Sequence, residues 1–239
     1  AKTLPMTKLP VGATMINTRN IFVLFFLTVF FPVVSLAQIT DFRARAGVKV
    51  QKDLSKELTA SIEYEHRFDN LLTTFDKALI EPALSFDFTK RIRVGAEWRF
   101  MIDQNLVREI EYKQRASAYF RYNYPMGDFD LKAKIALQYG FDELTFSSGK
   151  SSKLINRNTF ELEYDWFGSK FTPFVVYEFF YHVNNKNGGI INQWKAKAGT
   201  SYRINKRSEL SVFYLFEKEI NVAHPVDAHV FGIGYTYKL

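Results

Sequence analysis

The chain has 239 residues, with 32 basic and 25 acidic side chains and no cysteine. Disulfide frameworks, zinc–thiolate sites and cysteine nucleophiles are therefore excluded. Aromatic residues make up 17% of the chain, and Gly and Pro contribute only 12 and 7 residues, so the composition is that of a globular or a membrane protein rather than a disordered or collagen-like one.

Residues 1–37 are predicted to contain an export signal. They carry three basic residues and no acid, and they include an apolar run from Ile21 to Val34 that is too short for a spanning helix. Small residues at Ser35 and Ala37 complete the pattern of a secretory signal peptide cleaved after Ala37. Cleavage leaves 38–239 as a single domain with a net charge of +4, which gives no reason to expect a nucleic-acid partner.

The remaining chain alternates apolar and polar residues with a period of two, and no long segment has helical spacing. The segment 92–102 is the clearest, because every second residue from Ile92 to Ile102 is apolar while Arg93, Glu97 and Arg99 lie between them. We therefore predict an all-β chain. Its alternating segments are 42–50, 58–68, 78–88, 92–102, 110–124, 129–141, 157–166, 171–183, 190–202, 210–216 and 229–239.

Alternation alone also permits a soluble barrel with an apolar interior. Two further patterns favour an antiparallel transmembrane β-barrel of the bacterial outer membrane. Short turns, expected on the periplasmic side, follow the odd-numbered segments, and longer polar loops such as 142–153 and 184–189, expected outside the cell, follow the even-numbered ones. Aromatic residues gather beside the short turns, as in an interfacial girdle: Phe86, Phe88, Tyr122, Tyr124, Phe129, Tyr164, Trp166, Phe171 and Tyr202.

The number of alternating segments is odd, whereas bacterial barrels usually have an even number of strands. We therefore predict about twelve strands, with one strand poorly marked in the sequence, and ten strands as the alternative.

Three stretches, 47–58, 95–100 and the arginine-rich 112–122, resemble a family of small, uncharacterised outer-membrane proteins of Gram-negative bacteria, the domain of unknown function 2490 type. This resemblance implies the barrel fold and the outer membrane, and it brings no catalytic residue. The final segment, which contains Gly234, Tyr237 and Leu239, resembles the C-terminal signal that the outer-membrane insertion machinery recognises, although the commonest form ends in Phe.

The polar face of the strands is the candidate functional site. In the lumen of a barrel, a track of fixed cations would lower the barrier for anions. This predicted basic track consists of Arg93, Arg99, Lys113, Arg115, Arg121, Lys132, Lys134, Lys195 and Lys197, and it shares the face with the acids Glu97, Glu111, Glu161 and Glu163. Two functions stay open: a passive, porin-like pore for small polar or anionic solutes, and a structural or accessory barrel with a salt-bridged lumen.

A barrel-embedded hydrolase of the lipase, deacylase or protease type is the alternative from a different class. None of the histidines His66, His182, His224 and His229 stands in nucleophile–base spacing with a serine, and Ser147, Ser148, Ser151 and Ser152 fall in a separate predicted loop. His224, Asp227 and His229 form only a weak metal-ligand pattern. We therefore expect no enzyme activity and no cofactor.

The expected partners follow from the predicted fold and compartment. They are outer-membrane lipid and lipopolysaccharide, the insertion machinery and, for an accessory barrel, a protein partner in a larger outer-membrane complex.

Overall fold

The computed structural model describes residues 39–69, 74–104, 109–141, 153–186, 188–222 and 225–239. The predicted signal peptide lies outside the described residues. Among the described residues, no helix is long and apolar enough to cross a membrane.

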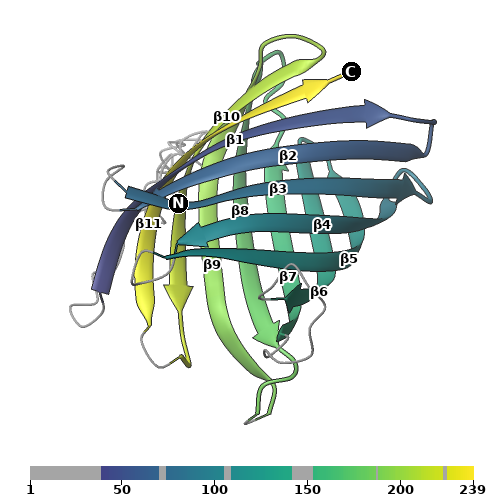
Figure 1. Ribbon diagram of the computed structural model, residues 1–239. Helices are drawn as coiled ribbons and strands as arrows, with labels where there is room; N and C mark the ends of the chain where they lie inside the picture. The colour runs from purple at the N-terminus through teal and green to yellow at the C-terminus, as the bar shows by residue number, and fades with distance from the viewer. Residues whose placement is uncertain (1–38, 70–73, 105–108, 142–152, 187, 223–224) are drawn as a thin grey trace, which may run out of the picture. The chain divides into compact units, whose positions relative to one another are not determined.

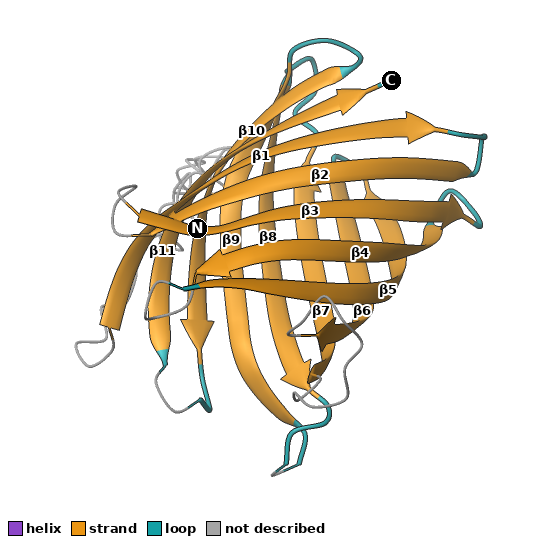
Figure 2. Ribbon diagram, in the orientation of Figure 1, coloured by secondary structure: helices purple, strands orange, loops and turns teal. Residues whose placement is uncertain are grey.

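The described chain folds into eleven β-strands that close into a barrel. Figures 1 and 2 show how these strands are arranged. Each strand except β1 and β11 pairs in antiparallel fashion with its two neighbours in the chain. The strands are β1 (Ile39–Asp53), β2 (Leu58–Asp69), β3 (Thr74–Asp87), β4 (Ile92–Gln104), β5 (Ile110–Met126), β6 (Phe129–Phe141), β7 (Lys153–Tyr164), β8 (Phe171–His182), β9 (Ile190–Arg203), β10 (Ser208–Glu219) and β11 (Val226–Lys238).

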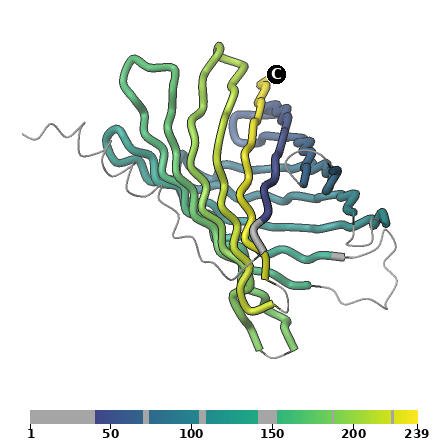
Figure 3. Tube along the Cα trace, turned by 90° about the vertical axis from the view of Figure 1, so that its left-hand side faces the viewer, coloured from purple at the N-terminus to yellow at the C-terminus, as the bar shows by residue number. Residues whose placement is uncertain are grey.

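The predicted all-β fold is confirmed, whereas twelve strands, and the alternative of ten, are wrong. The barrel closes with eleven strands because β1 and β11 run in the same direction and pair in parallel over thirteen residues, from Ile39 beside Val226 to Gln51 beside Lys238. Figure 3 shows β11, in yellow, running alongside β1, in purple. No unmarked strand is needed, since a parallel pair satisfies the backbone groups that an odd number of strands would otherwise leave at an open edge.

The alternation seen in the sequence separates the two faces of the barrel wall. Apolar residues point outward and remain uncovered, as Ile62 on β2 (50% exposed) and Ile135 on β6 (53%) show. The intervening residues point into the lumen, where most of the charged side chains pair with one another. The molecule is therefore apolar outside and charged inside, the reverse of a soluble barrel with an apolar interior.

A small apolar cluster lies inside the barrel, on the wall formed by β10 and β11. Leu215, Ala228 and Val230 are buried there, and Phe213 packs against them. The Phe213 ring lies on Gly232, where a Cβ atom would come within 2.0 Å of Phe213 Cζ. Because Gly232 has no side chain, the Phe213 ring can pack directly against the backbone of β11.

The short turns lie at the end of the barrel where β1 and β11 finish. The predicted aromatic residues gather there on neighbouring strands, with ring-centre separations of 4.9 Å for Phe129 and Tyr164 and 4.8 Å for Phe171 and Tyr202. The expected asymmetry of loop length holds in part. The connection between β2 and β3 spans only residues 70–73, so it is no longer than the short turns.

Candidate functional site in the barrel lumen

The predicted basic track faces the lumen, but acids interrupt it. Within the described residues, six of its nine cations form ion pairs with acids on the same or a nearby strand. All four predicted lumen acids, Glu97, Glu111, Glu161 and Glu163, are among the partners. The pairs are Arg93 with Asp87, Arg99 with Glu81, Lys113 with Asp103 and Glu111, Lys132 with Glu161 and Glu163, Lys134 with Glu97, and Lys195 with Glu217.

Three cations of the track, Arg115, Arg121 and Lys197, have no ion pair in the part of the chain that the structure describes. Arg115 lies directly opposite Arg99, and Arg121 directly opposite Arg93, in the register of β4 and β5. The ammonium of Lys197 lies over two rings, 5.4 Å from the centre of Phe174 and 5.3 Å from that of Phe213. These contacts give Lys197 a cation–π environment.

The most buried ion pairs lie partway along the strands. Arg45 on β1 pairs with Glu217 on β10, and their side chains are only 9% and 6% exposed. Lys195 on β9 reaches the same carboxylate, with its Nζ 2.7 Å from Glu217 Oε1. Inward apolar residues at this level, such as Val230 and Leu215, are also buried. Side chains from the neighbouring strands β1, β9, β10 and β11 thus pack against one another on the lumen face at this level.

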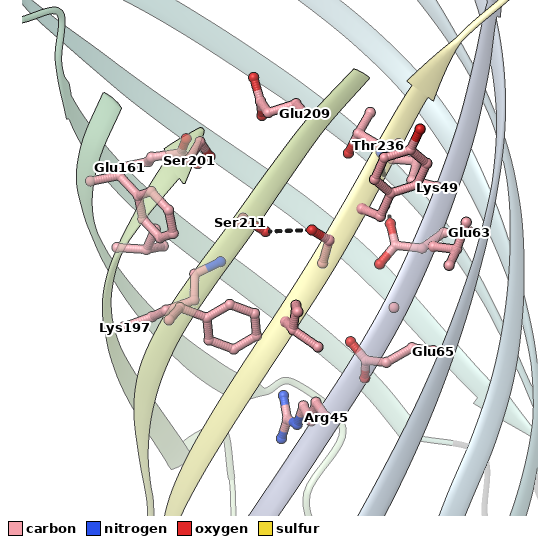
Figure 4. A pocket seen from close by; sticks show the side chains of 18 of the residues that line it. Arg45, Lys49, Glu63, Glu65, Glu161, Lys197, Ser201, Glu209, Ser211 and Thr236 are labelled. Carbon is pink, nitrogen blue, oxygen red and sulfur yellow. Dashed lines mark hydrogen bonds and ion pairs between the residues drawn. The ribbon is translucent and has the colours of Figure 1, made fainter. Parts of the chain in front are cut away.

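A cavity of about 400 Å³ occupies the lumen between this layer and the short turns. Its walls come from β1, β2 and β7 to β11, and charged residues from opposite walls point into it, as Figure 4 shows. Glu63 and Glu65 lie on one side, Lys197 and Glu161 on the other, and Arg45 at the inner end. A second recess of about 120 Å³ lies on the β1 to β6 side and shares Lys49 and Glu63 with the first.

The family model for proteins of unknown function DUF2490 matches residues 46–225. The chain belongs to the DUF2490 family. None of the curated proteins searched matches it.

Two solved structures resemble this DUF2490 barrel at low identity. The outer-membrane expressed OmpT of Vibrio cholerae is 10% identical, with a TM-score of 0.40 over 68% of this chain and 54% of that one. A bacterial polysaccharide outer membrane secretin is 11% identical, with a TM-score of 0.42 over 76% of this chain and 73% of that one. This chain spans about half the length of the OmpT chain.

Of the four histidines considered from the sequence, the structure of the DUF2490 barrel describes His66, His182 and His229. His66 and His229 belong to outward aromatic clusters, with ring centres 4.4 Å from Phe68 and 5.2 Å from Phe42 respectively. His224 and the serines Ser147, Ser148, Ser151 and Ser152 lie outside the described residues. Among the residues that the structure describes, no group of three or more His, Cys, Asp or Glu side chains could hold a metal ion.

Sequence reasoning missed several acids that form lumen ion pairs, among them Glu178 and Glu217. Glu178 pairs with Arg157 at 2.5 Å, and it could have been found because it alternates with Val176 and Phe180 on β8. Glu217 was missed because the predicted strand ended at residue 216, before the charged end of β10.

The residues of the predicted insertion signal lie along β11 and at its end. Gly234 lies beside Gly47 of β1, and Tyr237 beside Val50. Leu239 is exposed, and its backbone N–H donates to the carbonyl oxygen of Gln51 at 2.9 Å. The signal stays a prediction, since a folded barrel does not test how it was inserted.

Proposed function

We propose that this protein is an outer-membrane β-barrel whose lumen is closed by ion pairs and which serves as a structural or accessory barrel rather than as an open pore. The assignment to the outer membrane is supported by the apolar outer face of the barrel. Ile62, Leu84, Phe120 and Ile135 are between 44% and 53% exposed although they lie within strands. A closed barrel with such a face suits hydrocarbon, because all ladder hydrogen bonds are made within the sheet.

The dimensions of the barrel are also suitable for a membrane. Its strands have between 12 and 17 residues, and about 9 to 11 tilted residues suffice to cross the hydrocarbon layer. The aromatic pairs beside the short turns occupy the level at which interfacial girdles occur. These features support an orientation with the short turns in the periplasm, and contact with outer-membrane lipid and lipopolysaccharide.

The single observation that carries the closed lumen is the buried contact of Arg45 and Lys195 with Glu217. Ion selectivity in a pore is commonly built on rings of like-signed side chains. Here two cations lie against an acid instead of forming a ring of one sign, and the side chains of Arg45 and Glu217 are shielded from solvent. We therefore expect no enzyme activity and no conduction, and we infer that the interior stiffens the barrel. As an accessory barrel, the protein would work together with another outer-membrane protein.

Single-channel recording tests this proposal. The purified protein in a planar bilayer should give no stable conductance steps. The double variant Arg45→Ala with Glu217→Ala should leak, because it removes the pair that fills the lumen. A matched double variant, Lys49→Ala with Glu63→Ala, removes an ion pair that is 39% and 35% exposed and should stay closed. Regular steps from the unmodified protein would overturn the closed lumen and favour the pore.

A further inference from the structure

The smaller recess of the lumen carries three adjacent cations. In the register of β4, β5 and β6, Arg93 lies directly opposite Arg121, and Arg121 directly opposite Lys134. All three side chains line the recess of about 120 Å³. Side chains directly opposite each other have Cβ atoms about 5 Å apart, and like charges at such positions repel. The fold therefore concentrates positive charge at this place in the wall.

The two outer cations of this row have acidic partners. Arg93 donates to Asp87, with Nη2 at 2.6 Å from Oδ2. Lys134 pairs with Glu97 at 2.5 Å, and its ammonium lies 3.9 Å from the centre of the Tyr119 ring. Both cations are thus held in place and largely neutralised.

Arg121, in the middle of the row, has no acidic partner among the described residues. Its Nε is buried and has no hydrogen-bond partner. A guanidinium carries five N–H donors and no acceptor, so an unsatisfied buried donor costs free energy unless a ligand or water accepts from it. Among the described residues, Arg121 is the cation in this recess without an acid within ion-pair distance.

The acids that line the recess do not supply the missing charge, because each already has a cation. Glu63 pairs with Lys49, Glu81 with Arg99, and Glu97 with Lys134. The recess and the direct partners of its charged groups therefore carry one positive charge in excess, which matches one negative charge on a ligand.

The ring of Tyr119 forms part of the wall of the recess, against Gly95. A Cβ atom at Gly95 would come within 2.5 Å of Tyr119 Cζ, so the ring occupies the space that a side chain at Gly95 would need. Hydroxyl-bearing residues Thr59, Ser61 and Ser85 complete the lining. The available volume is several times what one water needs, so a small oxyanion with a few waters fits.

We propose that this recess is a binding site for a small oxyanion of the phosphate type, with Arg121 as its principal ligand and Arg93 and Lys134 beside it. A guanidinium suits this ligand because its planar fork matches the oxygens of phosphate. Both a free phosphate-bearing solute and the phosphate of a lipid headgroup have the required chemistry. The site does not depend on whether the lumen conducts.

Calorimetric titration of the purified protein in detergent with inorganic phosphate, against chloride at the same ionic strength, tests the proposal. We expect saturable binding of phosphate that is at least about tenfold weaker in Arg121→Gln, since this substitution removes a charge-assisted hydrogen bond. Arg115→Gln is the matched control, because Arg115 is an equally unpaired arginine six positions away on the same face of β5 and outside the recess. It should bind phosphate like the unmodified protein.

A second variant, Arg121→Lys, keeps the charge and guards against a folding defect in Arg121→Gln. We expect it to bind phosphate several times more weakly than the unmodified protein, because the fork is lost. Competition by glycerol phosphate would identify a free solute, and competition by short-chain phosphatidylglycerol a lipid headgroup; either result supports the oxyanion site. Absence of saturable phosphate binding by the unmodified protein, or equal binding by a folded Arg121→Gln, would overturn it.

Discussion

Gly47 of β1 lies directly beside Gly234 of β11, in the parallel pair that closes the barrel. In a barrel of eleven strands joined by hairpins, the first and last strands must run in the same direction, so one parallel pair is unavoidable. Here that pair is as extensive as the antiparallel ones, with a register that continues to Gln51 and Lys238. The parallel pair therefore closes the sheet along the whole length of β1 and β11 that pairs.

Disulfide cross-linking tests the parallel closure. Ala46 and Ile233 are register partners on the outer face, and a disulfide needs Cα atoms about 4.4 to 6.8 Å apart. In a chain with no native cysteine, the double variant Ala46→Cys with Ile233→Cys should cross-link on mild oxidation, as a mobility shift on gels would show. The pair Ala46→Cys with Tyr237→Cys, offset by four residues or about 13 Å, should not. Cross-linking of the offset pair alone would rule out this register.

A second prediction concerns Gly199 of β9. A Cβ atom there would lie 2.4 Å from the backbone oxygen of Val212 and 2.7 Å from Phe213 Cβ, so the backbone itself would have to move. Gly199→Ala should therefore lower the free energy of unfolding by about 1 to 3 kcal/mol, as overpacking does. Urea unfolding followed by tryptophan fluorescence would measure this loss.

Gly140→Ala is the control for that measurement. The nearest atom to its added Cβ would be the Lys153 carbonyl oxygen at 3.9 Å, an ordinary contact. Its effect should stay within about 0.5 kcal/mol. Equal losses at the two glycines would contradict the close packing of Phe213 against β9.

The buried carboxylate of Glu217 gives a third prediction. Glu217→Ala would leave Arg45 and Lys195 without an acid within ion-pair distance among the described residues. Breaking a buried pair in this way costs about 3 to 5 kcal/mol. Glu63→Ala, which breaks the more exposed pair with Lys49 at 3.7 Å, should cost less than about 1 kcal/mol. Urea unfolding compares the free energies of unfolding of the two variants. A loss for Glu217→Ala no larger than that for Glu63→Ala would show that the lumen is hydrated at the level of Glu217.

The sequence predicted the strands well because each strand has one charged and one apolar face. The prediction was least accurate where that contrast weakens. β7 begins at Lys153 rather than 157, since the polar Asn156 interrupts the alternation before 157; its side chain accepts a hydrogen bond from Asn158, two residues along the same face. β10 extends to Glu219 through the charged residues 217–219, where Lys218 pairs with Asp227 across the strands at 3.6 Å.

The strand number and the pairing of charges could not be obtained from the sequence in the same way. The alternation of apolar and polar residues indicates which face of the sheet a residue occupies. It does not indicate which residue lies opposite on the neighbouring strand. Lys195 was predicted as part of a basic track, and only the register of β9 and β10 places it opposite Glu217. The preference for even strand numbers likewise outweighed a correct count of eleven segments, because the sequence does not reveal a parallel closure.

The most direct test of the central claim, that the apolar outer face contacts lipid while the polar face lines the lumen, uses adjacent residues on β2. Ile62 points outward and is 50% exposed, while Ser61 lines the small recess of the lumen. Single cysteines at these positions, labelled with a small fluorophore, can be compared in vesicles that contain brominated lipids. We predict strong quenching of the label on Ile62→Cys and little quenching on Ser61→Cys. Equal, weak quenching at both positions, together with ready labelling of Ile62→Cys by a charged water-soluble reagent, would contradict a membrane-spanning barrel.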